Sequence, residues 1–184
     1  GKPFEPKELL LRIKNIISKK NTINLNQIQK IGEATINLNK MEINIINFQD
    51  KFEKDFYDLN IEWLEYFFQV EDYDYEVLSN SKKYIINKGG KIFFAESEGN
   101  IIGTVALMPT KNKLVFELTK MAVKPEFRNK GIGKKLLKKC IEYSSANNCS
   151  SIILYSNKKL DNAIHLYRTY GFKETKMEKK SPYL

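Results

Sequence analysis

The sequence predicts an α/β (α+β) fold, in which a mixed and mostly antiparallel sheet is flanked by helices and preceded by an N-terminal amphipathic helix and linker. Three observations support this fold class. Apolar residues recur at helical spacing in some segments and alternate in others, in the order strand, helices, antiparallel meander, helix, strand, helix, strand. Hydrophobic residues make up 42% of the chain, which is enough for a core. The 184 residues fit one ordinary domain with an appendage.

The first half of the chain begins with an apolar stripe. Residues 5–20 are predicted as an amphipathic helix, because Pro6 suits a first turn and apolar residues follow at helical spacing. That stripe consists of Leu9, Leu10, Ile13, Ile16 and Ile17. We then expect a polar linker over 20–29, an extended segment over 30–38, a strand over 41–48 and a helix over 50–68.

The second half reads as a meander followed by alternating helices and strands. Strands are predicted over 91–96, 101–108 and 114–123, with good turn chemistry at Glu98-Gly99-Asn100. A helix over 131–147 and a short apolar strand over 151–155 follow. We expect a further helix over 160–170, ended by Gly171, and a last strand over 172–178.

The net charge of +9 is unevenly distributed. Residues 111–139 hold ten basic and two acidic residues, whereas residues 50–76 hold ten acidic and two basic ones. A basic and an acidic block in one small domain indicate two different ligand surfaces, although two solvated helix faces would give the same pattern.

Cysteine and histidine are scarce, with two cysteines and one histidine. This count excludes a disulfide scaffold and a Cys/His zinc site, so we expect no metal and a reducing cytoplasmic location. No apolar run approaches the roughly 18 residues that would span a bilayer, and the N-terminal residues do not resemble a secretory signal.

The chemistry is concentrated in MAVKPEFRNKGIGKKLL, residues 121–137. A predicted strand ends at Val123, and Gly131 and Gly133 open a basic helix after a short loop. Free N–H groups in the first helical turn and the positive helix end attract anions, so this arrangement is typical of a diphosphate cradle. The spacing fits neither the Walker loop nor the dinucleotide fingerprint, and a Gly-rich turn before a basic helix remains the alternative.

Four segments together resemble the GNAT superfamily of N-acetyltransferases: FELTKMAV, RNKGIG, YSN and LDNAIHLYRTYGF. The resemblance covers about residues 41–177, and we assign 41–184 to such a domain. It implies acetyl transfer from acetyl-CoA, as co-substrate, to a small-molecule or peptide amine by direct attack in a ternary complex. It also implies cofactor contacts at Met121, Ala122, Val123, Arg128, Asn129, Lys130, Gly131, Ile132, Gly133, Lys134, Asn157 and Asn162.

Two catalytic residues follow from the same resemblance. Tyr167 matches a tyrosine that protonates the departing thiolate, although it shares an apolar helix face and core packing is the alternative. Glu117 matches a general base that acts through water, with a salt bridge to a lysine as the alternative. Because strand side chains alternate, Glu117 and Met121 are expected on one face. For Asn157, a strand-ending turn is the alternative role.

The acidic, tyrosine-rich segment 71–76 falls where relatives build the acceptor side. Carboxylates beside aromatic rings suit a cationic amine, which makes a polyamine-like or lysine-like acceptor our hypothesis. His165 faces away from the stripe of its helix, and Cys140 and Cys149 carry no mark of a nucleophile.

Residues 2–20 resemble something else, the end of a response-regulator receiver domain, and residues 30–40 resemble the start of the winged-helix DNA-binding domain that often follows it. Lys2 matches the switch lysine of that domain, and we interpret 1–40 as a remnant formed by a helix and a linker. By analogy with receiver domains, the helix predicts a homodimer. A regulatory or DNA-associated module and a non-catalytic acetyl-CoA sensor are the alternatives; the sequence has no helix suited to reading bases, so we expect no nucleic acid and no membrane as partners.

Overall fold

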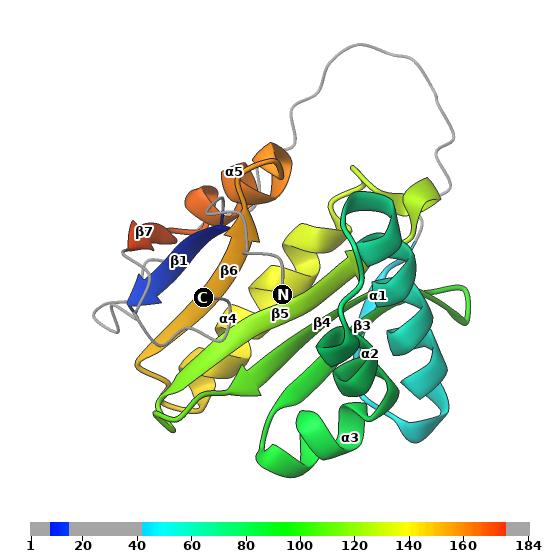
Figure 1. Cartoon of the computed structure of the whole chain (residues 1–184), viewed down its shortest axis with the longest axis horizontal. Coiled ribbons are helices and arrows are strands. Elements are labelled where there is room, and N and C mark those ends of the chain that lie inside the picture. Colours follow the sequence, from blue (N-terminus) through cyan, green and yellow to red (C-terminus); the bar gives the residue numbers. More distant parts are fainter. Residues whose placement is uncertain (1–7, 15–41, 176–184) are drawn as a thin grey trace.

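The computed structural model describes residues 8–14 and 42–175. Within these residues the fold is one seven-stranded mixed sheet with helices on both faces (Figure 1). The strand order across the sheet is β2-β3-β4-β5-β6-β1-β7. The strands are β1 (Glu8–Lys14), β2 (Asn44–Asn47), β3 (Lys91–Ser97), β4 (Asn100–Pro109), β5 (Val115–Val123), β6 (Ser151–Asn157) and β7 (Lys173–Thr175). The predicted fold class is therefore confirmed, with its β3-β4-β5 meander at the centre.

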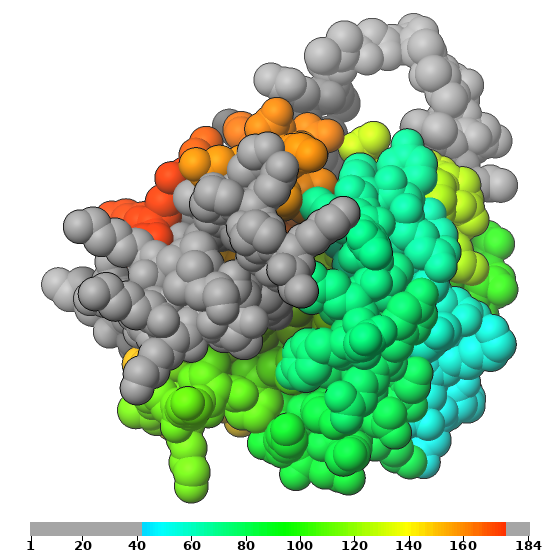
Figure 2. Space-filling view, in the orientation of Figure 1, coloured from blue at the N-terminus to red at the C-terminus, as the bar shows by residue number. Residues whose placement is uncertain are grey.

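The helices divide between the two faces of the sheet. The 3-10 helix η1 (Asp50–Phe52), α1 (Glu53–Phe67), α2 (Asp72–Ser79), α3 (Ser81–Tyr84) and the 3-10 helix η2 (Ile86–Lys88) gather on one side, where α1 to α3 form the cyan-to-green surface in Figure 2. On the other side are α4 (Ile132–Ala146) and α5 (Asp161–Thr169). The short helix η3 (Pro125–Phe127) lies in the loop between β5 and α4.

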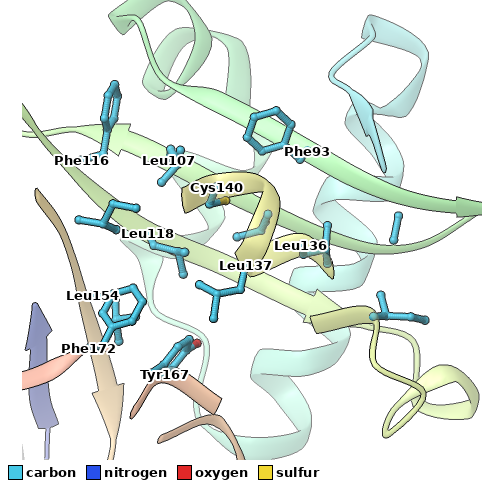
Figure 3. Packing of buried hydrophobic residues seen from close by; sticks show 14 of the residues in the cluster. Phe93, Leu107, Phe116, Leu118, Leu136, Leu137, Cys140, Leu154, Tyr167 and Phe172 are labelled. Atoms are coloured by element: carbon cyan, nitrogen blue, oxygen red, sulfur yellow. The ribbon is translucent and has the colours of Figure 1, made fainter. Parts of the chain in front are cut away.

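Each face of the sheet carries its own core. Under α4 and α5, Leu136, Leu137 and Cys140 pack against Leu107 and Leu118 of the sheet (Figure 3). Under α1 and α2, the second core is aromatic and aliphatic, and it consists of Phe56, Leu59, Val77, Leu78, Ile85, Ile92, Phe94, Ile101, Ala106 and Ala122. Two cores on opposite faces hold β4 and β5 rigidly between them.

The N-terminal helix prediction is wrong for the residues that the structure describes. Residues 8–14 form β1, which pairs antiparallel with both β6 and β7 and so lies inside the sheet. The segment ELLLRIK is a short apolar run, and such a run fits a buried strand as well as a helix. The strand forms because β6 and β7 both offer backbone hydrogen-bonding groups to this segment. Lys2 and residues 30–38 lie outside the described residues.

The remaining helices and strands agree with the predicted ones within a few residues, with one difference. The sequence analysis assigns the acidic segment 71–76 to no helix or strand, whereas residues 72–79 form α2. Glu71 is its N-cap, and a capping box joins Glu71 and Asp74. The side-chain acceptors at both positions satisfy the free amides of the first turn, which explains why an acidic stretch starts a helix.

Strands β5 and β6 are parallel neighbours over only a short length. Their pairing runs from Val115 opposite Ser151 to Glu117 opposite Ile153 and ends there. Beyond this point the two strands separate, as Figure 1 shows for the lime β5 and the orange β6. We call this divergence the β5–β6 fork. It leaves the main chain of β5 after Glu117 without a strand partner on that side, within the described part of the sheet.

A β-bulge lies in β5 just past the fork. Val105 of β4 stands opposite two residues of β5, Lys120 and Met121, and Lys120 has a φ of 52°. The extra residue resets the alternation of side chains. Glu117 therefore lies opposite Met108 on the α1–α2 side, whereas Met121 packs against the core under α4. The expectation that Glu117 and Met121 share a face is wrong because of this bulge.

Candidate functional site

The loop after β5 delivers a set of free amides to the start of α4. Asn129 and Gly131 have φ values of 63° and 79°, which turn the chain sharply before the helix. Among the described residues, Lys135 is the first residue of α4 whose amide has a main-chain acceptor, and it donates to Gly131 O at 3.2 Å. The N–H groups of Ile132 and Gly133 therefore remain available at the positive end of a 15-residue helix.

Gly133 keeps this helix end open. A Cβ atom added there would meet only the Leu166 side chain, at 3.7 Å, so the protein itself does not require glycine at this position. Gly131 adopts the left-handed conformation that glycine favours, with open space around its Cα. A small residue at Gly133 and a left-handed one at Gly131 together allow an anionic group to approach the backbone closely.

Lysines surround the helix start. Lys130 and Lys134 are exposed, and the Nζ atom of Lys130 lies 5.1 Å from the centre of the Phe127 ring. Lys135 is also exposed and donates from Nζ to Ile43 O at 3.3 Å. The predicted basic character of the loop is thus present on the surface of the protein, where it favours a diphosphate.

Arg128 is placed differently from the lysines. Its guanidinium is held by Val123 O at 2.9 Å and by the Glu62 carboxylate at 3.0 Å. The side chain lies against the C-terminal half of α1, near Glu62, Tyr66 and Phe67. Sequence reasoning missed Glu62, because nothing in the spacing of the motif indicates a partner 66 residues away.

The three β5 residues predicted to face the cofactor lie between the bulge and the loop. Met121 and Val123 are half-buried and pack against the core under α4, and Ala122 is buried in the opposite core. All three follow Glu117, so their backbone lies along the unpaired side of the β5–β6 fork. A bulge leaves backbone groups outside the regular ladder, and such groups can bond an extended ligand.

Tyr167 lies on α5, next to the fork. Its ring is 93% shielded and packs against Phe172 at a centroid distance of 5.7 Å (Figure 3). Burial, with a contribution from the nearby Cys140 thiol, raises the pKa of Tyr167 well above its ordinary value of 10.0. Within the described residues its hydroxyl has no hydrogen-bond partner. Tyr167 is thus a core residue with a protonated hydroxyl, and its catalytic role stays a prediction.

Glu117 is half-buried at the last residue pair before the fork. Burial raises the pKa of Tyr73 in α2, and the negative charge of Glu117 raises it further, so the Glu117 carboxylate lies near the Tyr73 hydroxyl. The carboxylate therefore points to the α1–α2 side of the sheet, next to the acidic helix. Tyr73 itself is 51% exposed, so a ligand can reach this corner from solvent.

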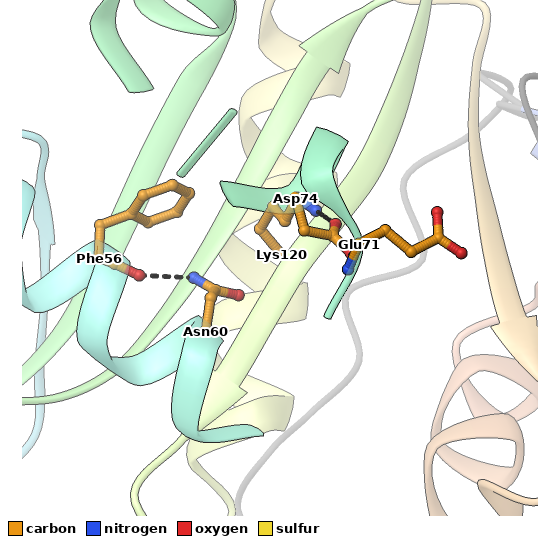
Figure 4. A network of polar contacts seen from close by, with 5 residues as sticks. All are labelled: Phe56, Asn60, Glu71, Asp74 and Lys120. Atoms are coloured by element: carbon orange, nitrogen blue, oxygen red, sulfur yellow. Dashed lines mark hydrogen bonds and ion pairs between the residues drawn. The ribbon is translucent and has the colours of Figure 1, made fainter. Parts of the chain in front are cut away.

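The acidic helix α2 is tied to the bulge. Lys120 Nζ lies 2.5 Å from Asp74 Oδ1, and both side chains are mostly shielded (Figure 4). Glu76 accepts a hydrogen bond from the Tyr84 hydroxyl. Asp74 and Glu76 thus have partners outside the segment 71–76, and Asp72 remains exposed at the start of α2. Lys120 is a residue of this corner that the sequence reasoning did not single out.

The other candidate residues are peripheral. Asn157 Oδ1 accepts the Lys159 amide at 2.9 Å, which is the strand-ending turn weighed as its alternative role. Asn162 and His165 are exposed on α5. Cys140 and Cys149 are buried and form no disulfide, and burial raises the pKa of both thiols. In the described ranges, 8–14 and 42–175, no cluster of three metal-ligating side chains is present and no helix could cross a membrane.

A splayed mixed sheet, a bulged strand at the fork and a helix start with free amides define an acyl-CoA-type acetyltransferase domain. A sequence model of the acetyltransferase (GNAT) family matches residues 54–172. The chain belongs to this family. The match includes every predicted catalytic and cofactor-contacting residue, from Glu117 to Tyr167, although it does not assign their roles.

Individual relatives agree with this family. The chain is 35% identical to N-acetylaspartate synthetase from Xenopus tropicalis over 97 residues, which are 52% of this chain but only 36% of the relative. A GNAT acetyltransferase from Staphylococcus aureus has a TM-score of 0.68 and 29% identity, covering 76% of this chain and 90% of that one. An acetyltransferase from Clostridium acetobutylicum, solved with acetyl-CoA, shares the fold with a TM-score of 0.62, 21% identity and coverages of 76% and 96%.

Proposed function

We propose that this chain transfers the acetyl group of acetyl-CoA to a primary amine by direct attack in a ternary complex. The observation that carries the proposal is the pair of amides at Ile132 and Gly133, which find no main-chain acceptor among the described residues and stand at the helix end beside a forked sheet. These amides, with Lys130 and Lys134, would hold the diphosphate of the co-substrate. The structure determined with acetyl-CoA in the Clostridium acetobutylicum relative supports the choice of co-substrate.

The unpaired side of β5 would bind the extended pantetheine arm. Backbone groups of Met121 and Val123 can pair with its amides as a further strand would, and the peptide group of Ala122 completes this edge. A backbone N–H here can also donate to the thioester carbonyl and stabilise the negative charge that develops on its oxygen. The peripheral Asn157 and Asn162 would contact the outer part of the same co-substrate.

Two side chains would move the protons. A new bond forms between the amine nitrogen and the acetyl carbon while the carbon–sulfur bond breaks. Glu117, acting through water, would take the proton that the amine loses, because it stands at the fork on the acceptor side. Tyr167 would give its proton to the departing thiolate, since its raised pKa keeps the hydroxyl protonated at neutral pH.

The acceptor would be a cationic amine that enters beside α2. Exposed Tyr73 and Tyr75 stand among the carboxylates of this helix, and rings with carboxylates attract ammonium groups. The name of the Xenopus tropicalis relative points instead to aspartate as an amine acceptor. An acidic entrance disfavours a dicarboxylate, so the two acceptors are separable by experiment. Two cysteines that form no disulfide are compatible with action in the reducing cytoplasm.

The test has two stages. Acetyl-CoA should raise the melting temperature of the protein in a concentration-dependent way, because a ligand that binds only the folded state stabilises it. CoA release should then be followed with a thiol reagent for spermidine, L-lysine and L-aspartate, with an amine-free control. Stabilisation without release for any amine would indicate a non-catalytic sensor, and absence of stabilisation would contradict the proposal. Faster turnover of L-aspartate would contradict the cationic acceptor.

A further inference from the structure

The Arg128 side chain bridges two parts of the candidate site. Its Nε donates to Val123 O at 2.9 Å, and its Nη2 donates to the two oxygens of Glu62, at 3.0 and 3.3 Å. The guanidinium also lies 5.6 Å and 5.7 Å from the ring centres of Tyr66 and Phe67. Thus one side chain joins the end of β5 to the second half of α1.

These contacts use two of the three guanidinium nitrogens, because Nε bonds the carbonyl and Nη2 bonds the carboxylate. The two rings add cation–π contacts to the same group. Only 25% of the Arg128 side chain is exposed, against 41% for Glu62. The positive charge is neutralised at short range, which leaves little of it for a second anion.

Arg128 directly precedes the turn that leads into α4, so the bridge can affect the geometry of that turn. The next residue, Asn129, has a φ of 63°, and the free amides of the α4 start follow at once. Such a turn keeps its direction only if its first residue is fixed. The bridge holds the Arg128 guanidinium between Val123 O and the Glu62 carboxylate, so the residue that precedes this turn is tied to α1.

Resting on the proposed function, we propose that Glu62 and Arg128 are positioning residues that set the diphosphate-binding loop against α1. The charge of the diphosphate is then met by main-chain amides and by Lys130 and Lys134, and the Arg128 guanidinium does not bind it. This differs from the direct contact that the R-x-x-G-x-G motif leads one to expect for Arg128.

A double-mutant cycle tests the proposal, with CoA binding to the full chain measured by titration calorimetry. Loss of one charge-assisted hydrogen bond should weaken CoA binding about five- to twentyfold in Glu62→Gln and in Arg128→Gln alike. The double variant should be no weaker than either single variant by more than about twofold, because both substitutions break the same bridge.

Direct phosphate binding by Arg128 gives the opposite pattern. Glu62→Gln would then leave CoA affinity unchanged or improve it, since the guanidinium would be released, and this result would overturn the proposal. Arg128→Lys separates the two cases again. Lysine keeps a point charge but cannot bond Val123 O and Glu62 together, so it should bind CoA as weakly as Arg128→Gln; restored affinity would overturn the proposal.

Glu65→Gln is the matched control, because Glu65 lies exposed on the same helix and its substitution changes the charge equally. It should bind CoA as the wild type does. Circular dichroism and melting temperature confirm that each variant is folded. If the wild type binds no CoA, the proposed function fails and this inference fails with it. If the wild type binds CoA and Glu62→Gln binds it equally well, only the inference fails.

Discussion

The Nζ atom of Lys120 lies 2.5 Å from Asp74 Oδ1, and this ion pair connects the bulge of β5 with α2 across 46 residues of sequence. Only 11% of the lysine side chain and 20% of the aspartate side chain are exposed. The pair thus fixes the acidic helix against the strand that would bind the thioester.

Lys120→Met should lower the free energy of unfolding by about 1–3 kcal/mol, because Asp74 loses its partner in a mostly shielded place. Urea denaturation measures this change. Lys113→Met, at an exposed turn position, should change stability by less than about 0.5 kcal/mol. Equal effects of the two substitutions would show that the Lys120 pair contributes no more than a surface lysine does.

Gly133→Ala should weaken acetyl-CoA binding at least about tenfold while slightly stabilising the protein. The added methyl group meets only the Leu166 side chain at 3.7 Å, and alanine favours a helix over glycine by about 1 kcal/mol. The same methyl group would obstruct a diphosphate at the helix start. Calorimetry and thermal unfolding give the two quantities separately, and a stabilised variant with unchanged affinity would place the diphosphate elsewhere.

Tyr167→Phe should reduce kcat about a hundredfold or more and leave the KM values within about twofold. The substitution removes only a hydroxyl group, and general acids contribute about 10²–10⁴-fold to rates. Melting temperature should hardly change, because the ring keeps its packing against Phe172. Steady-state kinetics with a thiol reagent provides the test, and an unchanged kcat would leave Tyr167 with a packing role alone.

The buried thiol of Cys140 should make the protein less stable in alkali. Burial raises the pKa of this thiol above its ordinary value of 9.0, so the unfolded chain loses a proton that the folded chain keeps. As the pH rises above 9, the unfolded state binds fewer protons and the free energy of unfolding falls. This group accounts for a decrease of about 1 kcal/mol between pH 9 and 10. Urea titrations at both values should show a smaller decrease in Cys140→Ala.

Neutralising two exposed carboxylates of α2 should raise the acceptor KM about three- to tenfold with acetyl-CoA affinity unchanged, because attraction of an ammonium group is largely electrostatic. The variant is Asp72→Asn with Glu76→Gln, which leaves Asp74 to hold Lys120. A matched pair, Glu42→Gln with Glu142→Gln, removes two exposed charges from other parts of the chain. Similar KM values in the two variants would show that general charge, and not α2, attracts the amine.

The sequence was sufficient to predict the parts of the fold that depend on local pattern. The helix that starts after Gly131 and the strands over 91–123 follow from periodicity, turn residues and glycine, and all of these act over a few residues. The loop 128–133 was recognisable for the same reason, since its chemistry is contained in consecutive residues. These are also the parts in which prediction and structure agree.

Features that depend on distant partners were not predictable. The bulge at Lys120 looks like ordinary strand sequence, and it is stabilised by Asp74 from another element. Likewise, the sequence shows an arginine at position 128 but not whether its side chain binds a phosphate or Glu62. The helix prediction for residues 8–14 is wrong because these residues pair with β6, in which Asn157 lies opposite Glu8 and Ser151 lies opposite Lys14. No local sequence pattern records backbone partners so far along the chain.

The strand β1 has a consequence for how the family domain holds together. The family match covers residues 54–172, yet the sheet also contains β1 and β2 from before that range and β7 from after it. Shortening the chain to the matched region would remove these three strands and strip β6 and β3 of their antiparallel neighbours β1 and β2. A bare strand edge of this kind invites pairing between molecules. We therefore expect a protein trimmed to its recognisable domain to self-associate, and the leading segment to act as an internal guard against aggregation.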